Sequence, residues 1–85
     1  MKYERTSDIQ ADIETLAAAF LNLKEGETEN VNNGDEELNL WVSFENGEYA
    51  IDYDAWSSLD RTVYKRGLSK VATALEAAKV VITVL

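Results

Sequence analysis

Hydrophobic and polar residues alternate on both sides of a central Asn-Gly pair. The alternation covers residues 38–54, and the pair is Asn46-Gly47. An Asn-Gly pair between two alternating runs is typical of a two-residue type I′ turn, so this stretch predicts a β-hairpin. A two-residue loop also sets the register of the two strands, which places Trp41 opposite Asp52.

The two faces of this hairpin differ in character, because successive side chains of a strand point to opposite sides. One face is apolar and is expected to pack in the core: Leu38, Leu40, Val42, Phe44, Tyr49, Ile51 and Tyr53. The other face is polar and acidic: Asn39, Trp41, Ser43, Glu45, Glu48, Ala50, Asp52 and Asp54. We expect the second face to be exposed to solvent.

An apolar stripe with helical spacing precedes the hairpin and predicts a helix over residues 8–24. Its members are Ile9, Ile13, Leu16, Phe20 and Leu23. Ser7 and Gln10 have the spacing of a capping box, so Ser7 is the expected N-cap residue. The polar residues 25–37, between this helix and the hairpin, predict a loop.

After the hairpin, the apolar residues no longer alternate with polar ones but recur at longer steps. Small and apolar residues recur at steps of four and predict a helix over residues 57–79: Leu59, Val63, Gly67, Val71 and Leu75. The alternative breaks this helix at Gly67 and starts a third helix at Ser69, because an interior glycine costs roughly 1 kcal/mol relative to alanine. Residues 80–85 are mostly β-branched and predict a final strand that is apolar on both faces.

Together these elements predict an α+β fold with two layers and the order α-β-β-α-β. The hairpin and the C-terminal strand form a three-stranded sheet, and both helices pack on one face of it. If the helix over 57–79 is continuous, a right-handed crossover places the last strand beside the first, which gives the strand order 2-1-3. A chain of 85 residues corresponds to a single domain, residues 1–85.

The sequence contains no cysteine and no histidine. Disulfides, thiolate catalysis and cysteine-based zinc sites are therefore excluded, and the commonest general base is missing. Asp52 and Asp54 lie about 6.7 Å apart on one strand face, but a catalytic carboxylate pair needs a cleft that raises one pKa. We expect no such cleft in a small two-layer domain, and predict that the protein is not an enzyme and needs no cofactor.

Residues 29–37 have a superficial likeness to a calcium-binding loop. With Gly34 at the sixth position, the third position falls on Val31, where an oxygen ligand is required. We therefore predict no metal site. The sequence also lacks a run of about 18 apolar residues and an apolar segment after its first residues, so we expect no membrane span, no secretory signal and a cytoplasmic location.

Charge is distributed unevenly along the chain, whose net charge is −8. No basic residue occurs between Lys24 and Arg61, whereas the basic residues Arg61, Lys65, Arg66 and Lys70 follow closely on one another. On the predicted helix these four form pairs at i,i+4, which are typical of a solvated face. Because the chain is acidic, we expect it to avoid bare nucleic acid and membranes, and to bind a basic protein or nucleoprotein complex.

The candidate partner-binding residues are an exposed aromatic residue and the acids around it: Trp41, Glu45, Glu48, Asp52, Asp54, Asp35, Glu36 and Glu37. An aromatic side chain surrounded by acids is typical of a binding hot spot; the alternative is that Trp41 is covered and belongs to the core. Trp56 is expected to pack in the interior. Carboxylates two apart on the strand, or four apart at Asp8 and Asp12, have about the spacing of successive phosphates.

These features predict a small acidic interaction module that inhibits a nucleic-acid-binding complex by mimicking its charge. In general character the chain is similar to the small acidic proteins with which phages block restriction or CRISPR complexes, that is, anti-restriction and anti-CRISPR proteins. The alternative is a homodimeric structural or assembly module, in which the doubly apolar final strand pairs across a two-fold axis. The acidity alone would also suit a salt-adapted or merely soluble protein.

Overall fold

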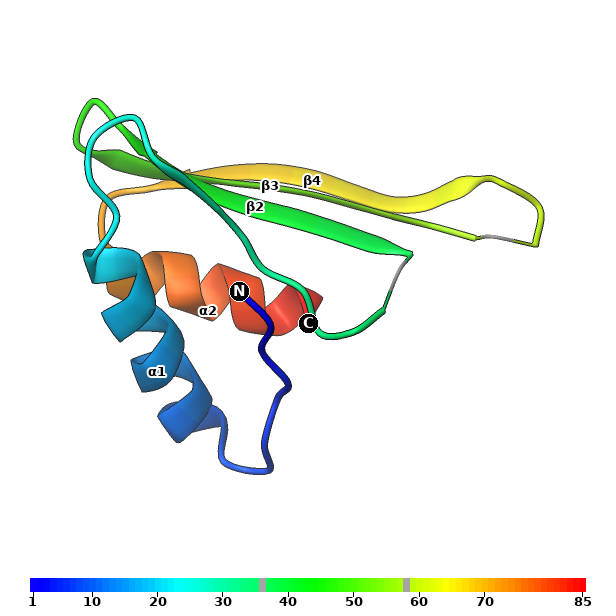
Figure 1. Cartoon of the computed structure of the whole chain (residues 1–85), viewed down its shortest axis with the longest axis horizontal. Coiled ribbons are helices and arrows are strands. Elements are labelled where there is room, and N and C mark those ends of the chain that lie inside the picture. The colour runs from blue at the N-terminus through cyan, green and yellow to red at the C-terminus, as the bar shows by residue number, and fades with distance from the viewer. Residues whose placement is uncertain (36, 58) are drawn as a thin grey trace.

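The computed structural model describes residues 1–35, 37–57 and 59–85. Two helices and four strands follow one another along the chain: α1 (Ile9–Leu21), β1 (Thr28–Asn30), β2 (Leu38–Glu45), β3 (Glu48–Trp56), β4 (Val63–Val71) and α2 (Ala74–Val84). The strands form one antiparallel sheet in the order β1-β2-β3-β4. Both helices lie on the same side of it, and the far end of the β3–β4 hairpin extends beyond them (Figure 1). Neither helix is long and apolar enough to cross a membrane, as far as the chain is described.

The α+β class and the central hairpin are confirmed. Residues of β2 and β3 pair in the predicted register, with Trp41 opposite Asp52. Asn46 and Gly47 have φ angles of 54° and 74°, as the two central positions of a type I′ turn require.

The core lies between the helices and the apolar face of the hairpin. Leu40, Val42 and Ile51 of the sheet are fully buried, whereas Phe44 and Tyr53 are half-buried. The helices contribute the buried residues Ile13, Leu16, Phe20, Ala74, Ala77, Ala78, Val81 and Ile82. The predicted separation of an apolar face from a polar face is therefore confirmed.

The predicted helix over 57–79 is wrong, and with it the three-stranded sheet and the strand order 2-1-3. Residues 63–71 form β4, which pairs antiparallel with β3 along its length. A step of four residues returns to the same side of a strand as well as to the same side of a helix, so the apolar pattern did not distinguish them. The alternative, a break at Gly67 with a third helix from Ser69, is wrong too, because Gly67 lies in the middle of the strand opposite Tyr53.

The predicted strand over 80–85 is also wrong, because residues 80–84 belong to α2 and Leu85 is its C-cap residue. The side chain of Thr73 accepts a hydrogen bond from the Glu76 backbone N–H and caps the helix. The buried residues of α2 recur at helical spacing and face the core. The doubly apolar strand that favoured a homodimer is therefore not present, and that argument for a dimer is lost.

Two smaller differences concern the first half of the chain. The loop predicted over 25–37 contains the short strand β1, which pairs with β2. The N-cap residue of α1 is Asp8 rather than Ser7: the Asp8 carboxylate accepts a hydrogen bond of 3.1 Å from the Ala11 backbone N–H. A carboxylate at this position also interacts favourably with the helix dipole.

Candidate protein-binding surface

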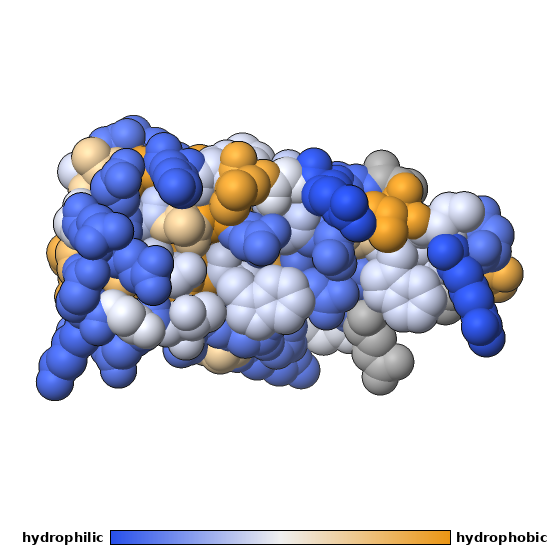
Figure 2. Space-filling view, turned by 90° about the horizontal axis from the view of Figure 1, so that it is seen from above, coloured by the Kyte–Doolittle hydropathy of each residue, from blue (hydrophilic) through white to orange (hydrophobic). Residues whose placement is uncertain are grey.

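The side of the sheet opposite the helices forms one continuous surface, which we call the open face. Residues that are paired across antiparallel strands share a face, so the register assigns its members. They are Thr28, Asn30, Asn39, Trp41, Ser43, Glu45, Glu48, Ala50, Asp52, Asp54, Arg66, Leu68 and Lys70. Figure 2 looks at the molecule from this side and shows a largely hydrophilic surface with paler and hydrophobic groups among the charges.

Trp41 lies in the middle of the open face and is 38% exposed. Asn30 of β1 is opposite it on one side and Asp52 of β3 on the other. Leu68 of β4 follows in the same row, opposite Asp52, and is 64% exposed. The exposure excludes the alternative that Trp41 is a core residue. Trp56, expected to pack in the interior, is half-buried at the end of β3.

Four of the predicted acids share the open face with Trp41. Glu45 and Glu48 are paired beside the turn, and Asp52 and Asp54 follow along β3. The Asp54 carboxylate accepts a hydrogen bond of 2.9 Å from the Asn39 side-chain amide. The sheet therefore brings these four carboxylates to one surface, as the alternation predicted.

Two basic side chains also lie on the open face, although the sequence pattern had placed them on a helix. Arg66 lies opposite Asp54 and Lys70 opposite Ala50, both on the open face. The face thus has three acids on β3 and one, Glu45, at the end of β2, and it is basic along β4. The sequence carried no clear signal for these residues, because β4 does not separate polar from apolar side chains and its apolar step of four favoured a helix.

The predicted acids of the loop precede the first residue of β2. They lie at the end of the strand that is away from the Asn46-Gly47 turn. The Asp35 carboxylate accepts a hydrogen bond of 2.9 Å from the Glu37 backbone N–H, and the Glu37 carbonyl accepts one of 3.0 Å from the Trp56 N–H. The loop is thereby tied to the end of β3. Glu36 lies outside the described residues.

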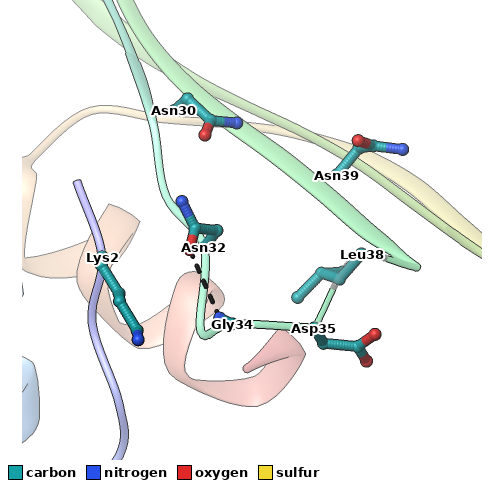
Figure 3. Close-up of a pocket in the computed structure, with 7 residues that line it drawn as sticks. All are labelled: Lys2, Asn30, Asn32, Gly34, Asp35, Leu38 and Asn39. Carbon is teal, nitrogen blue, oxygen red and sulfur yellow. Dashed lines mark hydrogen bonds between the residues drawn. The ribbon is translucent and has the colours of Figure 1, made fainter.

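A hollow of about 340 Å³ opens beside this loop, lined by Lys2, Asn30, Asn32, Gly34, Asp35, Leu38 and Asn39. Its side chains do not converge on one point: Asn39 and the pair Asn32 and Lys2 lie on opposite sides of β2 (Figure 3), and the Asn30 amide donates a hydrogen bond of 3.1 Å to the Leu40 carbonyl. The Asn32 side-chain oxygen accepts a hydrogen bond of 3.3 Å from the Gly34 N–H. A small-molecule site needs convergent polar groups, so the open face is the better candidate.

The predicted row of carboxylates at Asp8 and Asp12 is wrong, because Asp12 is fully buried. Its carboxylate accepts hydrogen bonds from the Tyr3 hydroxyl at 2.6 Å, the Thr6 hydroxyl at 2.9 Å and the Thr6 backbone N–H at 3.0 Å. These bonds, the one from Tyr3 first, lower the pKa of Asp12 despite its burial. The same bond raises the pKa of Tyr3. Asp12 therefore fastens the N-terminal segment to α1.

This arrangement predicts a loss of stability in acid. A carboxylate with a lowered pKa stabilises the folded state fully above its unfolded pKa of about 4, and this contribution is lost as the pH falls through the folded pKa. We expect Asp12→Asn to flatten the acid limb of a plot of melting temperature against pH. At neutral pH the variant should melt lower, on the order of 5 °C, because the Tyr3 hydroxyl and the N–H and hydroxyl of Thr6 are left with one acceptor oxygen instead of two.

Circular dichroism melts between about pH 2 and pH 7 would measure this effect. Glu14→Gln is the matched control, because Glu14 is an exposed carboxylate on the same helix. An unchanged acid limb in Asp12→Asn would contradict the assigned role of the buried carboxylate.

Comparison with protein-family models, with curated proteins and with solved structures found no match for this chain. Its function is therefore inferred from its own residues and their arrangement.

Proposed function

We propose that the protein is an interaction module that binds a basic protein surface through the acidic part of its open face. The observation that supports this best is the exposed Trp41 in the middle of a flat sheet surface, with carboxylates of β2 and β3 on the same face. Tryptophan is enriched among the residues that dominate binding energy at protein interfaces. The surrounding acids would attract and orient a partner of opposite charge.

We further propose that the partner is a nucleic-acid-binding protein, inhibited when this face occupies its nucleic-acid site. Asp52 and Asp54 are about 6.7 Å apart along β3, close to the spacing of successive phosphates, and the net charge of −8 favours a positively charged channel. Restriction and CRISPR complexes are partners of this kind. Arg66 and Lys70 lie on the β4 part of the open face, so the mimicking contact would be confined to β2 and β3.

The test is capture of partners by the immobilised protein from a host lysate at low and raised salt. We expect a nucleic-acid-binding protein to be retained at low salt and displaced by added DNA or RNA. Trp41→Ala and the double variant Asp52→Asn/Asp54→Asn should each weaken binding of that protein about tenfold or more.

The matched control is Glu4→Gln/Glu14→Gln, which removes the same amount of charge from exposed positions on the helix side of the molecule. It should bind within about twofold of the unchanged protein. Equal loss in both double variants would mean that net charge alone matters, and would contradict a site on the open face. Retention unaffected by nucleic acid would contradict the mimicry.

A further inference from the structure

The strand β4 forms one edge of the sheet. It is nine residues long and pairs with β3 on one side, and among the described residues no strand pairs with its other side. An edge strand presents a row of backbone N–H and C=O groups that can pair with another chain.

The hairpin register identifies these outward groups. In a hairpin with a two-residue loop, the residues that flank the loop exchange hydrogen bonds, here Glu45 and Glu48. The even-numbered residues of β3 therefore bond to β2, and the odd-numbered ones bond to β4. The bond from the Trp56 backbone N–H to the Glu37 carbonyl agrees with this assignment, because Trp56 is an even-numbered residue and Glu37 directly precedes β2.

On β4 the residues opposite the odd positions of β3 are also odd, for example Gly67 opposite Tyr53. Their backbone groups are used within the sheet. The outward backbone groups then belong to even-numbered residues, including Arg66, Leu68 and Lys70, and the side chains of these three lie on the open face.

At the opposite edge of the sheet, the N-terminal segment bonds to the chain at the end of β1. The Tyr3 N–H donates to the Asn32 carbonyl at 2.7 Å, and the Asn32 N–H donates to the Met1 carbonyl at 3.0 Å. The Met1 amino group also donates to the Asn30 carbonyl and pairs with the Glu29 carboxylate at 3.1 Å. The N-terminal segment therefore covers one edge, whereas no segment that the structure describes covers β4.

Charge determines which strand can pair with β4. Arg61, Lys65, Arg66 and Lys70 lie in or just before this strand, and no acid occurs between Asp60 and Glu76. Antiparallel pairing of β4 with the same strand of a second copy would bring two basic edges together. Lysines on an edge oppose such pairing. They favour an acidic strand instead.

We propose that β4 is a docking edge for an extended acidic segment of another protein, which adds to the sheet as a fifth strand. Alternate side chains of this segment would lie beside Arg66, Leu68 and Lys70. The matching pattern is acid, any residue, apolar residue, any residue, acid. It reads the same in both directions, so it suits parallel and antiparallel addition. This site lies on β4, beside the acidic part of the open face that the proposed function uses, and its partner has the opposite charge.

The probe is a labelled, end-blocked peptide Thr-Glu-Thr-Val-Thr-Glu-Thr, titrated with the full chain in a fluorescence polarisation assay. We expect saturable binding, and none by the peptide with lysine in place of glutamate. Arg66→Gln/Lys70→Gln should weaken binding about tenfold or more. The control Lys24→Gln/Lys79→Gln removes the same charge from exposed positions off β4 and should change it about twofold at most.

N-methylation of the peptide tests the backbone pairing. Methyl groups on one alternate set of amides should abolish binding, and methyl groups on the other set should leave it intact, because only one set faces β4. Equal effects of the two sets would show attraction by charge alone and overturn the proposal. So would absence of binding, or self-association of the protein through β4 that excludes the peptide.

Discussion

Replacement of Phe20 by alanine is expected to lower the free energy of unfolding by about 3–5 kcal/mol. The Phe20 side chain is fully buried between α1 and the sheet, and its backbone carbonyl accepts a hydrogen bond of 3.4 Å from the Tyr49 hydroxyl. The substitution removes the ring and leaves a cavity that the core can close only in part. For a small protein this is a large share of a total stability of about 5–15 kcal/mol.

Urea unfolding followed by tryptophan fluorescence and by far-UV circular dichroism would measure the loss. Leu21→Ala is the matched control, since Leu21 is the next residue on the same helix and is 70% exposed. We expect it to change stability by no more than about 0.5 kcal/mol. Similar losses in the two variants would mean that α1 packs through a different side.

The central hairpin was predictable because two local signals agreed. Strict alternation of side chains requires a period of two, and Asn46-Gly47 supplies the positive φ angles of its turn. Neither signal depends on the rest of the molecule. The strand pairing and the face on which Trp41 lies followed directly from them. The exposure of Trp41 did not, because it depends on whether another segment covers that face.

The strand β4 was not predictable from the same rules, because its side chains do not separate into polar and apolar sets. Its open face combines Arg66 and Lys70 with Leu68, and the other side has Gly67 opposite Tyr53. The strand is specified by pairing with β3 rather than by its own pattern. The candidate site was therefore predicted with its acids and without its basic border.

The C-terminal helix shows the reverse case, in which a local signal was present but outweighed by propensity. Thr73 and Glu76 have the spacing of a capping box, the Thr73 side chain accepts a hydrogen bond from the Glu76 backbone N–H, and the buried residues of α2 follow at helical spacing. The β-branched residues at 80–84 favour strands when they are considered alone. Burial of the helical stripe against α1 and the sheet decides in favour of the helix.

Replacement of Gly67 by valine is expected to destabilise the β3–β4 pair by about 1–3 kcal/mol. A Cβ atom on Gly67 would lie 2.5 Å from the ring carbon Cζ and the hydroxyl oxygen of Tyr53. The Tyr53 ring thus occupies the space that a side chain at position 67 would need. It would have to swing away from the strand and from the Lys65 ammonium, which lies 5.8 Å from the ring centroid.

The control for this prediction is the same substitution in a Tyr53→Ala background. There the obstruction is absent, and valine should be neutral or stabilising by up to about 1 kcal/mol, because glycine weakens a strand interior and a β-branched residue favours it. Urea midpoints of the four proteins complete a double-mutant cycle. An equal cost of Gly67→Val in both backgrounds would show that Tyr53 is not the obstacle. If Gly67→Val is costly only where Tyr53 is present, the Tyr53 ring packs on Gly67 in the folded protein. This close packing would then help to hold β4 in its register beside β3.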